Sequence, residues 1–252
     1  MKISVVIPCY NSEETILKCL KSVLNQSYKP SEIIVVDDGS IDKTEDEIRK
    51  FIEISDIPVV FYKQENNGPS TARNLGVALS SGNWIAFLDS DDYWDEEKIM
   101  LQVEFLINNP DVGLVGSGNL KSNNVEYISF NKLLNRNYFQ TSAVLVKKDI
   151  ITKYEFNQRQ KYSEDYLCWL KICCDYKVAI IHPRSVFPIS KNIAFGGNGL
   201  SSRLFDMEKW ELQNYWWFYK KGKISILTLL KVSCYSILKF FRRIVIKVFY
   251  EK

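Results

Sequence analysis

Residues 84–92 have the sequence Trp-Ile-Ala-Phe-Leu-Asp-Ser-Asp-Asp, in which an apolar run is followed at once by three carboxylates. The apolar run predicts a buried strand that ends at Asp89. Adjacent carboxylates repel one another unless a cation neutralises them. A hard divalent ion with oxygen ligands, Mg²⁺ or Mn²⁺, is their natural partner, usually completed by phosphates and water. An acidic turn that caps a helix is the simpler interpretation of the same residues.

The residues that precede this stretch alternate between two kinds of pattern. Short β-branched runs at 3–7, 32–36 and 59–62 predict strands, and apolar residues at helical spacing predict helices between them. The first of these helices is expected to begin at Asn11 or Ser12. This alternation predicts an α/β fold with a mostly parallel central sheet and helices on both faces.

A second acidic turn, Asp37-Asp38-Gly39-Ser40, follows the strand predicted at 32–36. Ligands of parallel α/β sheets bind beyond the carboxyl ends of the strands, so both acidic turns are expected at the site. A carboxylate there can accept hydrogen bonds from a base or ribose, and Gly39 permits close approach of the backbone. An ordinary Asp-Gly turn is the alternative.

The alternation becomes irregular after Asp92. Helices are predicted at 95–108 and 163–174, strands at 112–115, 143–146 and 178–181, and two aromatic-rich helices complete the chain. We divide the chain into a half at 1–110, a second half of the same domain at 111–219, and a basic helix at 220–252.

The composition excludes several kinds of chemistry. His182 is the only histidine among 252 residues, so Ser-His-Asp, Cys-His and His-rich metal sites are disfavoured, and the six cysteines lack zinc-site spacing. The sequence contains no dinucleotide-binding glycine motif and no P-loop. Nine of the 33 basic residues and one of the 30 acidic residues lie in 220–252. Residues 1–219 therefore carry a net negative charge, which gives no reason to expect nucleic-acid binding by bulk charge.

Four motifs in a fixed order resemble the family-2 glycosyltransferases of GT-A fold. They are Val5-Val6-Ile7-Pro8-Cys9-Tyr10-Asn11, residues 33–40 ending in Asp-Asp-Gly-Ser, Asn67-Gly68-Pro69-Ser70-Thr71-Ala72-Arg73-Asn74, and Phe87-Leu88-Asp89-Ser90-Asp91-Asp92. The resemblance is close over about 3–110 and looser to 200. It implies a GT-A nucleotide-sugar-binding fold, here with added C-terminal helices, and transfer of a sugar from a nucleotide-sugar, with a UDP-sugar favoured.

The resemblance also implies the roles of individual residues. Asp91, and after it Asp89, would hold Mn²⁺ or Mg²⁺, while Asp92 would be structural or orient the sugar. The donor would be bound by residues from all four motifs, namely Pro8, Tyr10, Asp37, Asp38, Arg73, Asp89 and Asp92.

The catalytic base of the family is an acid in a Glu-Asp pair that opens a later helix, and Glu164-Asp165 matches it. The resemblance therefore implies that Asp165 removes the proton from the acceptor hydroxyl of a glycan or lipid-linked acceptor in one displacement, with inversion. Two acids at a helix N-terminus also fit simple capping. The Gly-rich residues 190–205 are expected to cover the substrate, with Arg203 near phosphate, or to be a plain surface loop.

Residues 223–250 predict a basic amphipathic helix. Leu227, Leu230, Leu238 and Phe241 belong to its apolar stripe, and lysines and arginines lie largely opposite. Such a helix fits a membrane surface, and the alternative is that it packs on the body. Together with the resemblance, it implies a cytoplasmic protein, peripheral on the inner face of the cell membrane. A sugar-nucleotide nucleotidyltransferase and a non-catalytic nucleotide- or sugar-binding module are the alternative functions.

Overall fold

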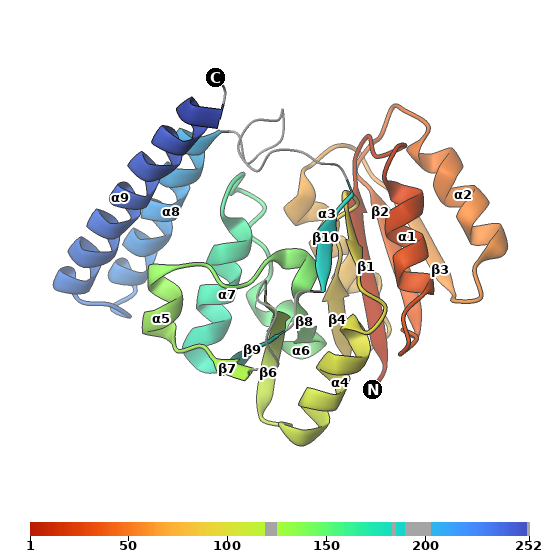
Figure 1. Cartoon of the computed structure of the whole chain (residues 1–252), viewed down its shortest axis with the longest axis horizontal. Helices are drawn as coiled ribbons and strands as arrows, with labels where there is room; N and C mark the ends of the chain where they lie inside the picture. Colours follow the sequence, from red (N-terminus) through yellow and green to blue (C-terminus); the bar gives the residue numbers. More distant parts are fainter. Residues whose placement is uncertain (119–124, 183–184, 190–202, 251–252) are drawn as a thin grey trace.

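The computed structural model of the chain describes residues 1–118, 125–182, 185–189 and 203–250, and of 247–250 only the helical backbone. Within the described residues, an eight-stranded sheet with the order β3-β2-β1-β4-β8-β6-β9-β7 forms the centre of the molecule, and β5 and β10 pair separately (Figure 1). The strands are β1 (Ile3–Cys9), β2 (Glu32–Asp37), β3 (Val59–Lys63), β4 (Trp84–Phe87), β5 (Asp92–Trp94), β6 (Val112–Ser117), β7 (Val125–Tyr127), β8 (Leu145–Lys147), β9 (Lys177–Ile181) and β10 (Val186–Pro188).

The sheet is mostly parallel, as the alternating sequence pattern predicted. β1 pairs in parallel with β2 and β4, β2 with β3, and β6 with β9, whereas β8 runs antiparallel to both β4 and β6. The pairing of β4 with β8 joins strands from 1–110 and 111–219 in one continuous sheet. The strand predicted at 143–146 begins only at Leu145, because Thr141–Ala143 form a 3₁₀ turn (η1).

Helices cover both faces of the sheet, which confirms the predicted layer order. Alternate residues of β1 enter two cores: Val5 and Ile7 pack on one face, and Val6 packs on the other. The first face is covered by α1 (Ile16–Leu24), α2 (Thr44–Ile54) and α4 (Lys98–Asn108). The second is covered by α3 (Pro69–Leu79), α5 (Phe130–Asn135), α6 (Lys148–Tyr154) and α7 (Glu164–Asp175).

The first helix begins later than its sequence suggested. α1 starts at Ile16, and neither Asn11 nor Ser12 caps it. Asn11, at φ 47°, instead accepts a hydrogen bond from the Ile41 amide through Oδ1 at 3.0 Å. The Ser12 hydroxyl lies 2.8 Å from that of Ser90. Both polar side chains therefore tie the β1–α1 connection to neighbouring loops at the carboxyl end of the sheet.

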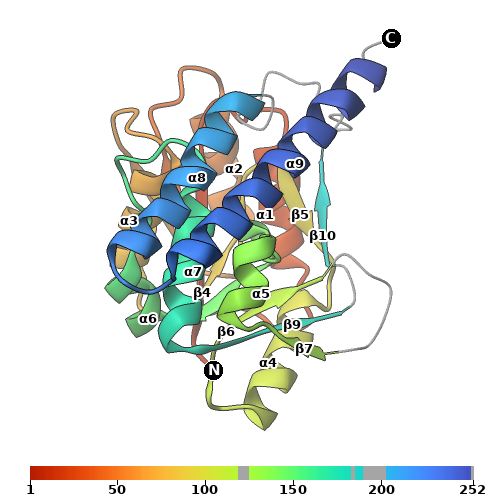
Figure 2. The ribbon, with the colours of Figure 1, turned by 90° about the vertical axis from the view of Figure 1, so that its left-hand side faces the viewer.

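Two long helices, α8 (Leu204–Lys220) and α9 (Ile226–Tyr250), lie side by side at one end of the molecule (Figure 2). One face of α9 is buried through Leu229, Val232 and Phe240. The opposite face is open, since Leu238 and Phe241 are 67% and 58% exposed. The helix thus packs on the body and presents an apolar surface as well. None of the helices in the described part of the chain combines the length and hydrophobicity needed to cross a bilayer.

Candidate active site

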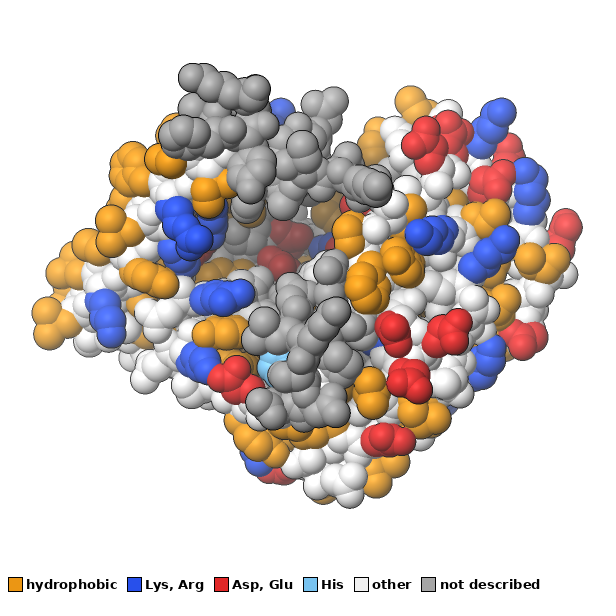
Figure 3. All heavy atoms as spheres, viewed as in Figure 1, with side chains coloured by type: hydrophobic (Ala, Val, Ile, Leu, Met, Phe, Trp, Pro, Cys, Tyr) orange, Lys and Arg blue, Asp and Glu red, His pale blue; other side chains and the backbone are white. Residues whose placement is uncertain are grey.

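The acidic turn predicted to be functional lies at the carboxyl end of β4. Asp89 is the second residue after the strand and is partly exposed, Asp91 is exposed, and Asp92 opens β5 and is buried. Figure 3 shows acidic side chains within a hollow at the centre of this face. Partial loss of hydration and the adjacent Asp89 carboxylate raise the pKa of Asp91, although its side chain still reaches solvent. A cation bound there would favour the ionised form of Asp91.

Arg73 connects this turn to the predicted base pair. It comes from α3, is 6% exposed, and its Nη2 donates to Asp89 Oδ1 at 2.7 Å while Nη1 donates to Glu164 Oε1 at 3.1 Å. Burial opposes the charge on Arg73, but the Asp89 and Glu164 carboxylates outweigh that effect and raise its pKa. A permanent cation between two acids fixes the relative positions of β4, α3 and α7.

Asp165 lies next to Glu164 in the first turn of α7, with Asn137 Nδ2 at 3.5 Å and Thr141 Oγ1 at 3.4 Å from its Oδ2 atom. These contacts are long, so the oxygen is only weakly held by the protein. Burial raises the pKa of Asp165, and hydrogen bonding from the Tyr166 amide and the charge of Arg73 oppose the rise. A carboxylate with a raised pKa and a loosely held oxygen has the properties of a general base.

The second acidic turn is held by an extensive network of its own. Asp38 is 4% exposed; its Oδ1 accepts from Gln64 Nε2 at 2.7 Å and the Asn67 amide at 2.8 Å, and its Oδ2 accepts from the Gly68 amide at 2.8 Å. Gly39 has φ 80°, and a Cβ there would lie 3.0 Å from the amide nitrogen of Asn66. A carboxylate has about four lone-pair sites, so Asp38 retains capacity for one more donor.

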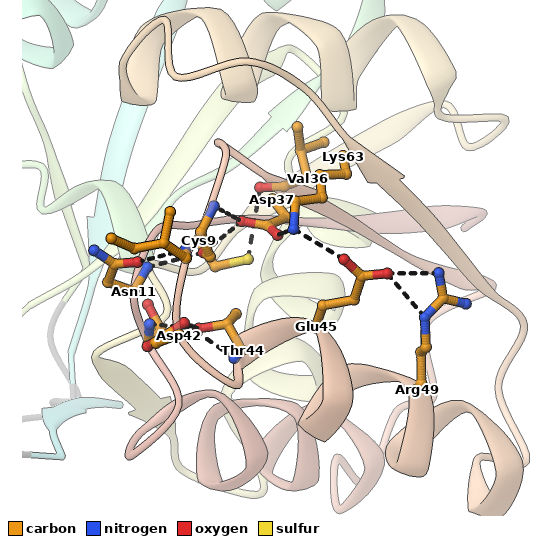
Figure 4. A network of polar contacts seen from close by, with 12 residues as sticks. Cys9, Asn11, Val36, Asp37, Asp42, Thr44, Glu45, Arg49 and Lys63 are labelled. Carbon is orange, nitrogen blue, oxygen red and sulfur yellow. Dashed lines mark hydrogen bonds and ion pairs between the residues drawn. The ribbon is translucent and has the colours of Figure 1, made fainter.

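Asp37 lies under the same turn and is fully buried. The amide and hydroxyl of Ser40 both donate to its Oδ1 atom, and Lys63 lies 3.6 Å from Oδ2. Figure 4 shows that Lys63 also forms an ion pair with Glu45, which in turn forms an ion pair with Arg49. Through these contacts Asp37 stabilises the conformation of the turn from below. The nearby Pro8 is buried in β1, whereas Tyr10 is 48% exposed just beyond it.

The acids after β4 fit a divalent ion of the kind the sequence predicted. Among the described residues, no three His, Cys, Asp or Glu side chains are grouped closely enough to form a metal site alone. Mg²⁺ and Mn²⁺ sites that act on phosphates need only one or two carboxylates, because phosphate and water supply the other oxygens. Asp91 and Asp89 meet that requirement, because both are carboxylates that follow β4 and neither is fully buried.

Residues 137–142, directly before the strand predicted at 143–146, contribute to the site although none of them was among the predicted site residues. Ser142 and Gln140 donate to Asp92 Oδ2 at 2.6 Å and 3.1 Å, and Ser142 Oγ accepts from the Asp89 amide at 3.1 Å. Burial and the neighbouring carboxylates raise the pKa of Asp92 to about 7 against these hydrogen bonds. The available signal was a polar run directly before a predicted strand, at the end of the sheet where the site lies.

Other features singled out in the sequence lie partly or wholly away from this network. Residues 190–202 lie outside the described residues, and Arg203 is exposed and 3.9 Å from Asp206. His182 is partly buried at the end of β9. The six cysteines are free thiols.

Comparison with known proteins agrees with the sequence resemblance. The model of the family described as glycosyl transferase family 2 matches residues 4–166. An uncharacterized glycosyltransferase of Haemophilus influenzae is 30% identical over 234 residues, which cover 89% of this chain and 90% of that protein. The chain therefore belongs to glycosyl transferase family 2 and is a glycosyltransferase. This membership favours the transferase over the nucleotidyltransferase and the non-catalytic module.

Two further comparisons bear on substrate and fold. The Escherichia coli protein named UDP-Glc:alpha-D-GlcNAc-diphosphoundecaprenol beta-1,3-glucosyltransferase WfgD is 32% identical over 189 residues, which cover 71% of this chain and 73% of that protein. The solved structure of the mannosyltransferase PcManGT from Pyrobaculum calidifontis, in complex with GDP-Man and Mn²⁺, superposes with a TM-score of 0.72 at 20% identity, covering 95% of this chain and 70% of that one. The second match confirms the GT-A fold.

Proposed function

We propose that this protein is an inverting glycosyltransferase that moves a sugar from a UDP-sugar to a hydroxyl of a lipid-linked glycan acceptor, with Asp165 as the base. The observation that carries the proposal is the buried Arg73, which binds Asp89 on one side and Glu164 on the other. One cation thus holds the acids after β4 beside the acid pair of α7. Such a site has one part suited to a metal-bound phosphate and another suited to proton removal.

The donor side comprises the carboxyl ends of β1, β2 and β4. The nucleotide is assigned to Pro8, Tyr10 and Asp38, with Asp37 supporting the turn; the exposed Tyr10 and the remaining acceptor capacity of Asp38 support this assignment. Arg73 acts there through Asp89, whose carboxylate it orients. The name of the WfgD relative supports UDP as the nucleotide.

Asp91 and Asp89 are the residues that would hold Mn²⁺ or Mg²⁺. The ion, when bound, stabilises the negative charge that develops on the leaving diphosphate. Asp92 is fixed by Ser142 and Gln140 and orients the turn or the sugar. The Mn²⁺ in the PcManGT complex supports a divalent ion for this fold.

On the acceptor side, Asp165 takes the proton from the attacking hydroxyl. Its raised pKa increases its strength as a base, and its long contacts to Asn137 and Thr141 leave Oδ2 open to a hydroxyl donor. Glu164 is already engaged by Arg73, which favours Asp165 for this role. A single base and a direct displacement imply inversion at the anomeric carbon.

The acceptor is proposed to be presented by a membrane. The open face of α9 carries Leu227, Leu230, Leu238 and Phe241, all exposed on one side of the helix. Contiguous apolar surface flanked by basic side chains suits the interface of an anionic membrane. The diphosphoundecaprenol acceptor in the name of WfgD supports a lipid-linked acceptor. The open face of α9 is the feature that supports a peripheral position, which we assign to the inner face of the cell membrane.

A donor screen followed by product analysis tests this function. Thermal unfolding is measured with UDP-, GDP- and dTDP-sugars, each with and without Mn²⁺, because a donor that binds the folded state raises the apparent stability. The selected donor is then incubated with a lipid-linked acceptor, and the anomeric configuration of the product is determined by NMR. A product with retained configuration, or a donor shift that is independent of the metal, would contradict the mechanism.

A further inference from the structure

A cavity lies beside the candidate active site, between α7 and the two C-terminal helices. It has a volume of about 510 Å³, and its walls come from the end of α5, from α7, from α8 and from α9. Four cationic side chains line it: Arg136, Lys239, Arg242 and Arg243. In Figure 3, basic side chains gather on the corresponding side of the molecule, over the C-terminal helices and α5. From the sequence, the cations of α9 were expected only on the polar side of an amphipathic helix.

The positive charge of this basic pocket is only partly neutralised by the protein. Glu211 is the carboxylate in its lining; its Oε1 accepts from Lys239 at 3.1 Å, and its Oε2 lies 4.0 Å from Arg243. Burial would raise the pKa of Glu211, but Lys239 and hydrogen bonds hold that pKa below its usual range. No carboxylate among the described residues lies within ion-pair distance of Arg136 or Arg242. The buried Glu208, which does not line the pocket, also interacts electrostatically with Arg243 and Lys239. Four cations near these two carboxylates leave an excess of positive charge at Arg136 and Arg242, which suits an anion.

The basic pocket adjoins the proposed base. Asn137 lines it and also contacts Asp165 Oδ2 at 3.5 Å, and Tyr166, the next residue of α7, lines it as well. An anion held by the arginines would therefore be close to an acceptor hydroxyl at Asp165. The acids that are assigned to the donor diphosphate, Asp89 and Asp91, do not line this pocket.

The same pocket adjoins the open apolar face of α9. Leu238 and Phe241 are exposed and directly precede Lys239 and Arg242 in the sequence. Successive residues of a helix point about a quarter-turn apart, so the apolar face and the cationic wall share an edge along α9. A molecule with an anionic head and a long apolar tail matches both surfaces at once.

We propose that the basic pocket binds the diphosphate of a polyprenyl-linked acceptor, with the prenyl chain along the open face of α9 and the sugar directed toward Asp165. Guanidinium groups suit this ligand, because their planar donors pair with phosphate oxygens in a bidentate manner. The proposal rests on the proposed function for the identity of the sugar-bearing lipid. The presence of the site itself is tested independently of sugar transfer.

The test measures binding of farnesyl diphosphate to the full chain by isothermal titration in detergent, with farnesol as the uncharged probe and inorganic pyrophosphate as the tail-less probe. The variants are Arg136→Gln, Arg242→Gln and the double variant. Lys209→Gln, which removes an exposed charge of α8 outside the pocket, is the matched control. Arg136 and Arg242 are both exposed, so the variants are expected to fold, and their thermal unfolding is checked first.

We expect the double variant to bind farnesyl diphosphate at least about tenfold more weakly than the wild type and Lys209→Gln, and to bind farnesol as the wild type does. Equal affinity for farnesyl diphosphate in the wild type and the double variant would overturn the proposal. Pyrophosphate that binds as tightly as farnesyl diphosphate would also overturn it, because the site would then not recognise a lipid.

Vesicles of phosphatidylglycerol distinguish a lipid headgroup from a prenyl diphosphate. If the double variant lost vesicle binding but kept farnesyl diphosphate affinity, the arginines would serve the membrane surface and the pocket assignment would fail. The UDP-sugar thermal shift with Mn²⁺ is measured in the same variants and is expected to be unchanged. Absence of a UDP-sugar thermal shift in the wild type would contradict the proposed function. Farnesyl diphosphate binding that depends on the two arginines would still support the assignment of the basic pocket.

Discussion

Arg73 and Glu164 lie 3.1 Å apart through Nη1 and Oε1, although 91 residues separate them in the sequence. The other guanidinium nitrogen binds Asp89 at 2.7 Å. This link crosses from α3 to α7 under the candidate site, and it gives the two acidic motifs one shared cation.

Replacement of Arg73 by Ala is expected to lower the free energy of unfolding by about 3–5 kcal/mol, because two carboxylates lose their buried partner. Arg73→Lys should lower the free energy of unfolding by less, because an ammonium group keeps the positive charge. Some loss should remain, because lysine lacks the rigid fork that reaches both acids. Urea unfolding followed by circular dichroism measures both variants. A loss below about 1 kcal/mol for Arg73→Ala would show that the link is not important for stability.

Replacement of Asp165 by Asn is expected to lower kcat for sugar transfer by about 100-fold or more, because the amide cannot accept the acceptor proton. Donor binding, measured as the thermal shift caused by the UDP-sugar with Mn²⁺, should be retained. Asp175→Asn, at the far end of the same helix, is the control and should keep the wild-type rate. Normal transfer by Asp165→Asn would move the base to another residue.

Replacement of Asp91 by Asn is expected to abolish the metal-dependent part of donor binding and to reduce transfer by about 100-fold or more, since charge stabilisation at a leaving group contributes at this scale. Titration of Mn²⁺ at fixed UDP-sugar concentration measures the effect. Asp95→Asn removes an exposed acid from the same segment and should leave the Mn²⁺ dependence unchanged. An unaltered Mn²⁺ dependence in Asp91→Asn would exclude Asp91 as a ligand.

The double replacement Leu238→Glu/Phe241→Glu is expected to reduce binding to phosphatidylglycerol vesicles at least about tenfold, as the two side chains would otherwise bury apolar area in the lipid. Both are more than half exposed at 67% and 58%, so the protein should remain folded. Ile107→Glu, which replaces an apolar residue of α4 that is 67% exposed, is the matched control for vesicle flotation. Point variants are preferable to deletion of 223–252, because Leu229 and Val232 of that segment belong to the core.

Lys98 offers a prediction about stability and pH. It is 1% exposed, its Nζ lies 3.8 Å from the centre of the Trp94 ring, and burial lowers its pKa well below 10.5. The unfolded chain keeps Lys98 protonated up to about pH 10.5, so folding has to release a proton or bury a charge. Lys98→Met is therefore expected to raise the free energy of unfolding at neutral pH by about 1–4 kcal/mol.

The sign of the pH dependence follows from the lowered pKa of Lys98. The unfolded state binds more protons than the folded state between the two pKa values, so the unfavourable contribution of Lys98 shrinks as the pH rises toward about 10.5. The advantage of Lys98→Met should accordingly be larger at about pH 7 than at about pH 9. Urea unfolding at both pH values checks this, and an advantage that grows with pH would contradict the assignment.

Much of the fold follows from the sequence alone. The β-branched runs, their alternation with helical patterns, and the acids after β2 and β4 are local features, and local side-chain periodicity decides which face of an element is buried. The family motifs, by their order, indicate the class of enzyme without the tertiary structure. The Glu164-Asp165 pair was found in the same way, because it opens a helix at a recognisable place in the chain.

The tertiary structure decided the relationships that act through space. Only the tertiary arrangement of α3 and α7 at the end of β4 brings Arg73 between Asp89 and Glu164. Only the pairing of β8 with β4 brings Ser142 to Asp92. The periodicity of α9 predicted an apolar stripe, but the same pattern fits a helix packed on protein and a helix on a membrane. The fold allows both, since α9 buries Val232 against the body, leaves Phe241 open, and turns Arg242 into a pocket beside the proposed base.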